Sequence, residues 1–133
     1  MTTREMLDSH PAEPLATYDE LTACIEACLA CAQACTTCAD ACLAEEHVAD
    51  LRSCIRTDAD CADVCTATAA VLSRQTAPDL RLVVALLEAC ATACASCAEE
   101  CEQHAGMHAH CRVCAEACRR CEAACRELLA SLA

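Results

Sequence analysis

The spacing of the cysteines constrains this sequence more than any other feature. Of the 133 residues 18 are cysteine, and along three stretches they recur in steps of three and four residues without a slip. Such steps place side chains on one face of an α-helix, whose period is about 3.6 residues. The pattern therefore predicts helices that each carry a row of thiols. The three regular rows are Cys24, Cys28, Cys31, Cys35, Cys38 and Cys42; Cys90, Cys94, Cys97 and Cys101; and Cys111, Cys114, Cys118, Cys121 and Cys125.

A fourth, sparser row is made by Cys54, Cys61 and Cys65. The remaining composition suits a helical chain with few bulky core residues. It includes 31 alanines but only 1 glycine, and Leu, Ile, Val and Phe together supply 22 residues. Alanine is the best helix former, and cysteine buries readily as a small hydrophobe. We therefore expect the thiols themselves to line the core.

The chain is expected to be all-α, with a segment over 1–16 that is irregular or a short helix and a bundle domain over 17–133. Short connections between helices imply antiparallel neighbours, so an up-down-up-down four-helix bundle is the natural packing. The expected helices cover residues 18–45, 48–75, 78–104 and 108–131.

Local signals support these boundaries. Thr17 and Glu20 have the spacing of a capping box, and Pro78 is expected near the first position of the third helix. Gly106, the only glycine, suits a helix C-terminal turn. The break between the first two helices has no glycine or proline, and the polar stretch 45–47 is its best place.

Small thiols cannot fill the space between four helices, so an empty core would contain destabilising cavities. We therefore expect guests, and a thiolate-only core selects Cu(I), zinc or iron–sulfur clusters. Zinc and iron–sulfur sites need four ligands that converge on one spot, usually from loops. Here the ligands lie in rows on straight helices, which favours two- or three-coordinate Cu(I).

Each Cys-x-x-x-Cys pair on one helical turn can hold one Cu(I), which leaves Cys54 and Cys111 to bridge between helices. The capacity would then lie between about 9 ions, with unshared thiolates, and about 18, with bridging thiolates. Multiple Cu(I) ions are thus the expected cargo.

The two ends of the bundle differ in character. At one end the inward positions become apolar and predict a closed plug of Leu21, Leu72, Val83, Leu87, Leu128 and Leu132. The opposite end gathers histidines and a methionine, which also bind copper. His104 and His108 continue the cysteine spacing and are the expected ligands there. Further candidates for copper access are His110, Met107 and His47.

Asp58 falls on the thiol face of the second helix, between Cys54 and Cys61. An unpaired buried carboxylate is expensive. Either Asp58 reaches water, a thiol or a cation near the open end, or the helix rotates and turns Thr57 inward. The unbroken spacing favours the first alternative and adds Asp58 to the candidate access residues.

The charge and the N-terminus bear on partners and compartment. The net charge of −12 argues against nucleic acid and against anionic membranes. The first residues lack the apolar segment of a secretory signal, and no run of about 18 apolar residues predicts a membrane span. We therefore expect a cytoplasmic protein, where thiols stay reduced and cysteine-rich chains bind metals.

The Cys-x-x-x-Cys pairs on four predicted helices, the alanine-rich background and the Met107-His108 turn resemble the bacterial copper storage proteins, specifically their cytosolic branch. The resemblance covers about residues 18–131. It implies a cysteine-lined four-helix bundle that assembles as a homotetramer and binds many Cu(I) ions. It also implies that the cysteines of the rows, with His104 and His108, are ligands.

Other functions remain open from the residues alone. They are a zinc or cadmium sink like a helical metallothionein, an iron–sulfur electron carrier, and a thiol redox buffer or disulfide-stapled protein. No Gly-rich phosphate loop or Ser/His/Asp set can be placed, so an enzyme is not expected. The expected protein partners are further copies of the chain and a copper chaperone or copper enzyme.

Overall fold

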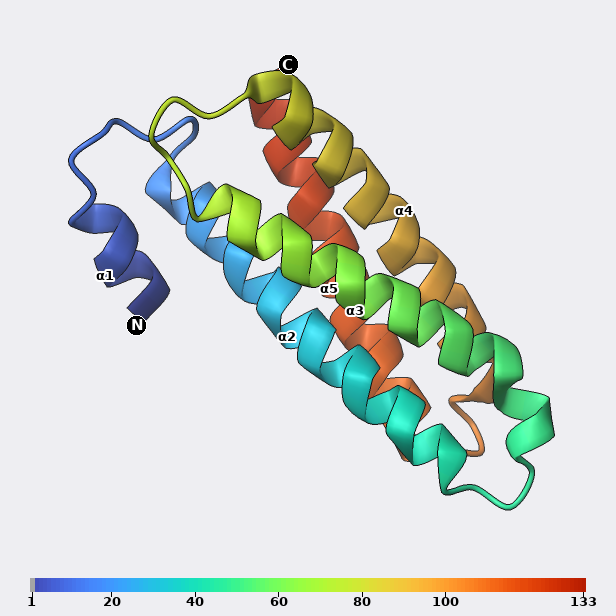
Figure 1. Ribbon diagram of the computed structural model, residues 1–133. Coiled ribbons are helices and arrows are strands. Elements are labelled where there is room, and N and C mark those ends of the chain that lie inside the picture. The colour runs from blue at the N-terminus through green and yellow to red at the C-terminus, as the bar shows by residue number, and fades with distance from the viewer. Residues whose placement is uncertain (1) are drawn as a thin grey trace.

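Residues 2–133, which the computed structural model describes, form a bundle of long antiparallel helices (Figure 1). Each long helix packs against the one before and after it, and the last closes the bundle against the first. These helices are α2 (Tyr18–Leu43), α3 (Arg52–Leu72), α4 (Leu80–His104) and α5 (Ala109–Leu132). The predicted all-α, up-down-up-down architecture is therefore confirmed. Across the bundle axis, α2 lies opposite α4 and α3 lies opposite α5.

A short helix, α1 (Thr2–Asp8), precedes the bundle and packs against α2. Its Leu7 side chain is buried with the core residues. Arg4 forms ion pairs with Asp8 and with Asp19 at the start of α2, and it also lies over the ring of Tyr18. Of the two alternatives expected for residues 1–16, a short helix is present, and it is attached to the bundle by both apolar and charged contacts.

Capping side chains decide where two of the helices begin. Thr17 accepts a hydrogen bond from the Glu20 backbone N–H at 3.2 Å, as its capping position predicts. The start of α4 corrects the prediction for Pro78, because the helix begins two residues later, at Leu80. The Asp79 carboxylate caps it by accepting from the N–H groups of Arg81 and Leu82, at 3.0 and 3.5 Å.

The C-terminus of α3 comes three residues earlier than expected, because Gln75 turns into the protein. Its side-chain amide donates to the carbonyl of Leu72 at 2.8 Å. Its side-chain oxygen accepts from the backbone N–H of Leu15 at 2.8 Å. Gln75 is therefore buried and satisfied, and it ties the segment before α2 to the end of α3.

The connection between α2 and α3 lies where the polar stretch indicated. Helix α2 ends at Leu43, and a 3-10 helix, η1 (Val48–Leu51), leads into α3. Leu51 in η1 is buried. Gly106 lies in the turn between α4 and α5, as predicted, but its φ is not positive, so this turn does not depend on the conformational freedom of glycine.

The predicted apolar plug lies at the end of the bundle that gathers the starts of α2 and α4 and the ends of α3 and α5. Its members are buried, except that Leu132 is only partly so: Leu21, Leu72, Val83, Leu87, Leu128 and Leu132. The remaining length of the core is filled largely by cysteine and alanine. The plug is therefore the part of the core that resembles an ordinary protein interior.

Two of the helices, α2 and α4, are long and apolar enough to cross a membrane by length and composition alone. Cysteine counts as apolar on hydropathy scales, so a helix with a row of thiols meets this criterion readily. In the bundle, the cysteines of both helices are buried. The same test is passed by core helices of soluble proteins.

Candidate metal centre

All eighteen cysteines are buried and none is in a disulfide. The helical period explains this placement, since each row lies on the face that its helix turns toward the bundle axis. The thiols therefore form one column along the axis, from Cys24 and Cys125 beside the plug to Cys42, Cys54, Cys101 and Cys111 at the opposite end.

Sulfur atoms meet between helices as closely as they do within one helix. The Sγ of Cys31 lies 3.8 Å from that of Cys35, one turn along α2. It lies 3.7 Å from the Sγ of Cys61 in α3 and 3.7 Å from that of Cys118 in α5. Contacts also cross the diagonals, as between Cys65 in α3 and Cys121 in α5 at 3.9 Å. A metal ion in this column can therefore draw its ligands from two, three or four helices.

Several sets of four thiols have all their sulfur atoms within 4.8 Å of one another. Successive sets share members, because Cys31, Cys35, Cys118 and Cys121 each belong to two of them. The column is thus a chain of overlapping sites. The sets include Cys28, Cys90, Cys121 and Cys125; Cys31, Cys65, Cys94 and Cys121; Cys31, Cys35, Cys61 and Cys118; Cys35, Cys97, Cys114 and Cys118; and Cys38, Cys42, Cys54 and Cys111.

Asp58 lies inside the column, and Thr57 does not take its place. Its carboxylate is fully buried and accepts from the thiols of Cys97 at 3.0 Å and Cys114 at 3.3 Å. Burial is the largest cause that raises the pKa of Asp58, to about 12. In the metal-free core this side chain is therefore a neutral acid in contact with thiols.

Burial also raises the pKa of the thiols of Cys42 and Cys111, and repulsion from neighbouring sulfurs adds to it. An apolar site disfavours the charged thiolate. A metal ion that binds there must displace the thiol proton and supply the charge that stabilises the thiolate. Without a metal ion, these two thiols are therefore held in the neutral form.

A cluster of imidazoles around Glu45 lies at the end of the bundle opposite the plug. The Glu45 carboxylate pairs with His108 Nδ1 at 2.7 Å and with His110 Nε2 at 2.9 Å. The two rings stack with their centroids 5.5 Å apart. Nδ1 of His110 then faces sulfur, 3.4 Å from Cys38 Sγ and 3.6 Å from Cys111 Sγ.

The ionisable groups in this cluster change one another's pKa. A hydrogen bond from His110 lowers the pKa of Glu45. Burial works against the charged form of His110, but its hydrogen bonds to Cys38 and Glu45 outweigh this effect and raise its pKa. Glu45 is therefore an ionised anchor for two imidazoles.

The other candidate residues of this end have different surroundings. His104 is partly buried and pairs with Glu100 at 3.3 Å, one turn earlier in α4. Met107 and His47 are exposed. Sequence reasoning singled out neither Glu45 nor the contact of His110 with two thiols, since both depend on how the turns at this end fold together. The acidic residues that open the α2–α3 connection were the available signal.

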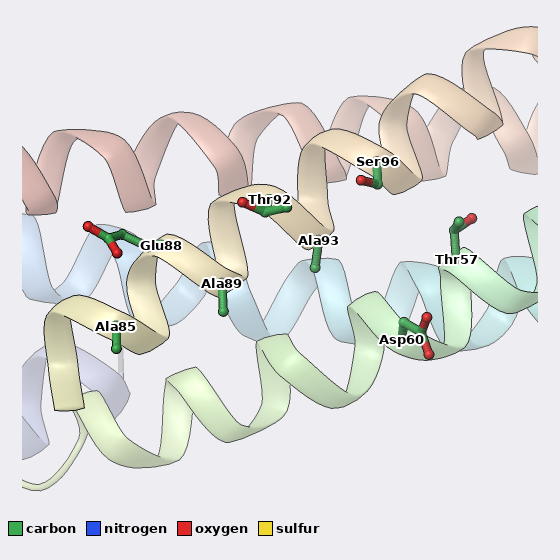
Figure 2. Close-up of a pocket in the computed structure, with 8 residues that line it drawn as sticks. All are labelled: Thr57, Asp60, Ala85, Glu88, Ala89, Thr92, Ala93 and Ser96. Atoms are coloured by element: carbon green, nitrogen blue, oxygen red, sulfur yellow. The ribbon is translucent and has the colours of Figure 1, made fainter.

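A surface groove lies outside the thiol column, between α3 and α4 (Figure 2). Its volume is about 510 Å³, and Figure 2 shows it lined by small and acidic side chains. The lining residues are Thr57, Asp60, Ala85, Glu88, Ala89, Thr92, Ala93 and Ser96. None of these is a thiol or an imidazole, so this groove lacks the ligands that distinguish the core.

The comparisons with known proteins agree with this geometry. The family model described as copper storage protein matches residues 17–130. The chain is 63% identical to Ccsp from Streptomyces lividans, solved with 10 copper equivalents, with a TM-score of 0.95 over 98% of this chain and 99% of that one. It is 69% identical to a cytosolic copper storage protein from Streptomyces lividans solved with five coppers, with a TM-score of 0.85 over 86% and 96% of the two chains.

A more distant solved relative is the Cu(I)-bound copper storage protein BsCsp3, which is 36% identical. Its TM-score is 0.73, and the match covers 83% of this chain and 98% of that one. No curated protein matches the chain. The family model spans most of the sequence, and two solved relatives share more than half of its residues. The chain therefore belongs to the copper storage protein family.

Proposed function

We propose that this protein stores Cu(I) ions as thiolate complexes along the axis of its helical bundle. The observation that carries the proposal is the column of overlapping thiol sets, in which single sulfurs such as Cys31 and Cys121 belong to two sets. Shared thiolates suit an ion that takes two or three soft ligands, and they allow many ions to lie close together. The main property of such a column is the number of ions that it can hold, and this property suits storage better than catalysis.

Zinc suits the same column less well. A structural zinc site closes a tetrahedron with four ligands of its own, and overlapping sets cannot all be filled in that way. Eighteen thiols would supply only about four such sites. The solved relatives that contain copper support the same choice of cargo.

The ligands in this proposal are the eighteen cysteines of the column, together with His104 and His108 at the end opposite the plug. At the same end of the bundle, His110, Met107 and His47 are the residues that ions would pass on their way to the column. Asp58 contacts four of the core thiols and would meet ions only after they have entered the column.

We further propose that residues 17–133 are the storage unit and that the protein works in the cytosol, as the Streptomyces relative described as cytosolic does. The homotetramer and an exchange partner, a copper chaperone or a copper enzyme, are proposals that rest on family resemblance. Sedimentation of the reduced protein with and without Cu(I) tests the tetramer directly.

Titration of the reduced, metal-free protein with Cu(I) against a competing chelator tests the storage function. Saturation beyond about nine Cu(I) ions per chain is expected, because nine is the limit when each ion takes two unshared thiolates. Saturation at or below that number would contradict the shared-thiolate column.

Three control measurements separate the rival functions. A zinc titration that saturates tightly at about four or five ions, with Cu(I) no better, would favour the zinc sink. Visible charge-transfer absorption in the protein as purified would favour iron–sulfur clusters. A low count of free thiols without reductant would favour the redox buffer or a disulfide-stapled protein.

A further inference from the structure

The thiols of the column lie in layers, to which each of the four long helices contributes one residue. The Sγ of Cys31 in α2 lies 3.7 Å from that of Cys61 in α3 and 3.7 Å from that of Cys118 in α5. The Sγ of Cys61 lies 3.8 Å from that of Cys94 in α4. These four cysteines, one from each helix, define the middle layer of the column.

The same register extends toward the end opposite the plug. Seven residues make about two turns of an α-helix, so positions seven apart lie on one face. Because neighbouring helices are antiparallel, a step of seven residues along each of them leads from the middle layer to one further layer. This end layer is Cys38, Cys54, Cys101 and Cys111. Sulfur contacts confirm it, at 3.6 Å between Cys54 and Cys101 and at 3.9 Å between Cys38 and Cys111.

The same step toward the plug leads to a layer in which only half of the residues are thiols. This inner layer is Cys24, Thr68, Leu87 and Cys125. All four side chains are 0% exposed, and the Sγ atoms of Cys24 and Cys125 lie 3.9 Å apart. One helical turn further in, the buried positions are all apolar, namely Leu21, Leu72, Val83 and Leu128. The inner layer is therefore the boundary between the thiol column and the apolar plug.

Thr68 takes the place of a thiol on α3 but offers no ligand that suits Cu(I). Its hydroxyl group donates a hydrogen bond to the backbone carbonyl of Val64 at 2.7 Å. Its oxygen is also a hard ligand, whereas Cu(I) prefers thiolate sulfur. On α4 the same layer presents Leu87, which has no ligand atom. An ion in the inner layer therefore finds sulfur at its own level only on α2 and α5.

The size of Thr68 matters as much as its chemistry. A threonine side chain has a bulk similar to that of cysteine, whereas the leucine that follows on this face of α3, Leu72, is larger. Protein interiors are close-packed, so a leucine at position 68 would occupy space within the layer. Thr68 therefore leaves room beside Cys24 and Cys125 that a leucine would fill.

We propose that Thr68 sets the inner limit of copper storage: it leaves room for one Cu(I) between Cys24 and Cys125 and supplies no third ligand. The innermost ion is then held by one thiolate from α2 and one from α5. This inference rests on the proposed storage function and names the residue that limits it beside the plug. On binding, the ion displaces the protons of the two thiols and remains Cu(I), so no oxidant or reductant is needed.

Enlarging Thr68 tests whether this residue keeps the space open. The protein is saturated anaerobically with Cu(I), bicinchoninate removes weakly bound metal, and native mass spectrometry counts the ions that remain. Thr68→Leu is expected to hold about one ion fewer per chain than the parent, because the inner layer accommodates one two-coordinate ion. Anomalous diffraction at the copper absorption edge should show that the missing ion is the one between Cys24 and Cys125.

Adding a ligand at the same position tests the coordination. Thr68→Cys supplies a soft ligand on α3 without a large change in volume. The anomalous peak of the innermost ion should move toward the new sulfur. In crystals soaked with excess bicinchoninate for increasing times, this peak should decline about tenfold more slowly than in the parent, since a third bond to sulfur must break.

Thr66 provides matched controls for both changes. It lies on the same helix, and its hydroxyl group donates to the Ala62 carbonyl at 2.8 Å, but its side chain is exposed. After treatment with the chelator, Thr66→Leu and Thr66→Cys are expected to keep the ion count of the parent. The innermost ion should also stay at its parent position in both control variants.

Four results would overturn the inference. The first is the absence of an ion between Cys24 and Cys125 in the saturated parent, and the second is an unchanged ion count in Thr68→Leu. The third is loss of the ion in Thr68→Val, because that variant removes the hydroxyl group and keeps the volume. If Thr68→Leu does not fold, as circular dichroism would reveal, Thr68→Cys carries the test. An ion that neither moves toward the new sulfur nor leaves more slowly is the fourth contradicting result.

The two proposals fail in different ways. A parent protein that binds only a few Cu(I) ions contradicts storage, whatever the substitutions at Thr68 do. A parent with full capacity whose inner layer is empty, or does not respond to these substitutions, keeps the storage function and loses only the role of Thr68.

Discussion

Asp58 Oδ1 accepts a hydrogen bond from the thiol of Cys97 at 3.0 Å. The other side chains that hydrogen-bond to the Asp58 carboxyl group are also thiols, those of Cys54, Cys101 and Cys114. The carboxyl group is held neutral by its burial. When the chain unfolds, it regains an ordinary aspartate pKa of about 3.9. This difference makes the stability of the metal-free bundle depend on pH.

The Asp58→Asn variant should therefore be more stable than the parent at neutral pH in the reduced, metal-free state. Because the pKa of Asp58 is raised in the folded state, its favourable contribution to the stability of the fold is complete below pH about 4. This contribution declines as the pH rises toward 12. The stability of Asp58→Asn relative to the parent should increase between pH 4 and 8, and the difference should vanish below pH 4. Thermal unfolding across this range measures it.

Asp60→Asn is the matched control, since this side chain lies on the same helix, is largely exposed and pairs with Arg56. It should leave the pH dependence of stability unchanged. Parallel stability curves for Asp58→Asn and the parent would show that the buried carboxyl is not the titrating group.

Glu45→Gln should weaken the interactions that hold the two stacked imidazoles, without changing the thiol column. The substitution removes the charge that holds His108 and His110. Loss of such an outer carboxylate commonly lowers metal affinity by about tenfold or more. We expect weaker binding of the ions at the histidine side and slower loading, with nearly unchanged total capacity. Competition titrations and stopped-flow loading measure the two effects.

Glu46→Gln, at the neighbouring exposed position, serves as the comparison and should behave like the parent. If Glu45→Gln lowered the total number of bound ions by half, Glu45 would have a role in the column that its position does not explain.

Leu87→Ala should destabilise the metal-free protein while leaving its copper capacity intact. Leu87 is fully buried in the apolar plug, and truncation of such a leucine costs about 2–5 kcal/mol. Urea unfolding of the reduced protein measures the loss. Leu82→Ala, an exposed position on the same helix, should change stability by no more than about 0.5 kcal/mol. A parallel fall in capacity would mean that the plug also shapes the thiol sites.

Gln75→Ala should loosen the segment before α2. The change leaves the N–H of Leu15 and the carbonyl of Leu72 without the partner that Gln75 provides, which costs about 1–3 kcal/mol when the groups stay buried. Unfolding experiments and limited proteolysis of residues 9–17 detect the loss. Gln103→Ala, at an exposed site in α4, should have little effect, and equal effects of both changes would refute the proposed tie.

Much of the bundle could be predicted because the cysteine period and the helical period coincide. The row from Cys24 to Cys42 is compatible only with a helix whose thiols share one face, and the apolar run at the other end of each helix predicts the plug. The residues at which the helices begin and end were harder to predict. Asp79 and Gln75 move two of them inward by two or three residues, because capping hydrogen bonds compete with the continuation of a helix.

The arrangement of the open end could not be predicted in the same way. Glu45 and His110 are 65 positions apart, and they meet because two separate turns fold over the same end. Nothing in local spacing encodes such a contact. The sequence indicated histidines at this end but not that His110 directs a nitrogen at Cys38.

Sequence alone determined that the chain is helical, that its thiols face inward and that soft metal ions are its cargo, since these properties follow from residue type and from a period along one helix. Tertiary structure decided which sulfurs become neighbours across helices, that Asp58 lies among them, and that His110 directs a nitrogen at Cys38. A helical period sets the direction of a side chain around its own axis. The rotation and register of one helix against another depend on packing along the whole bundle.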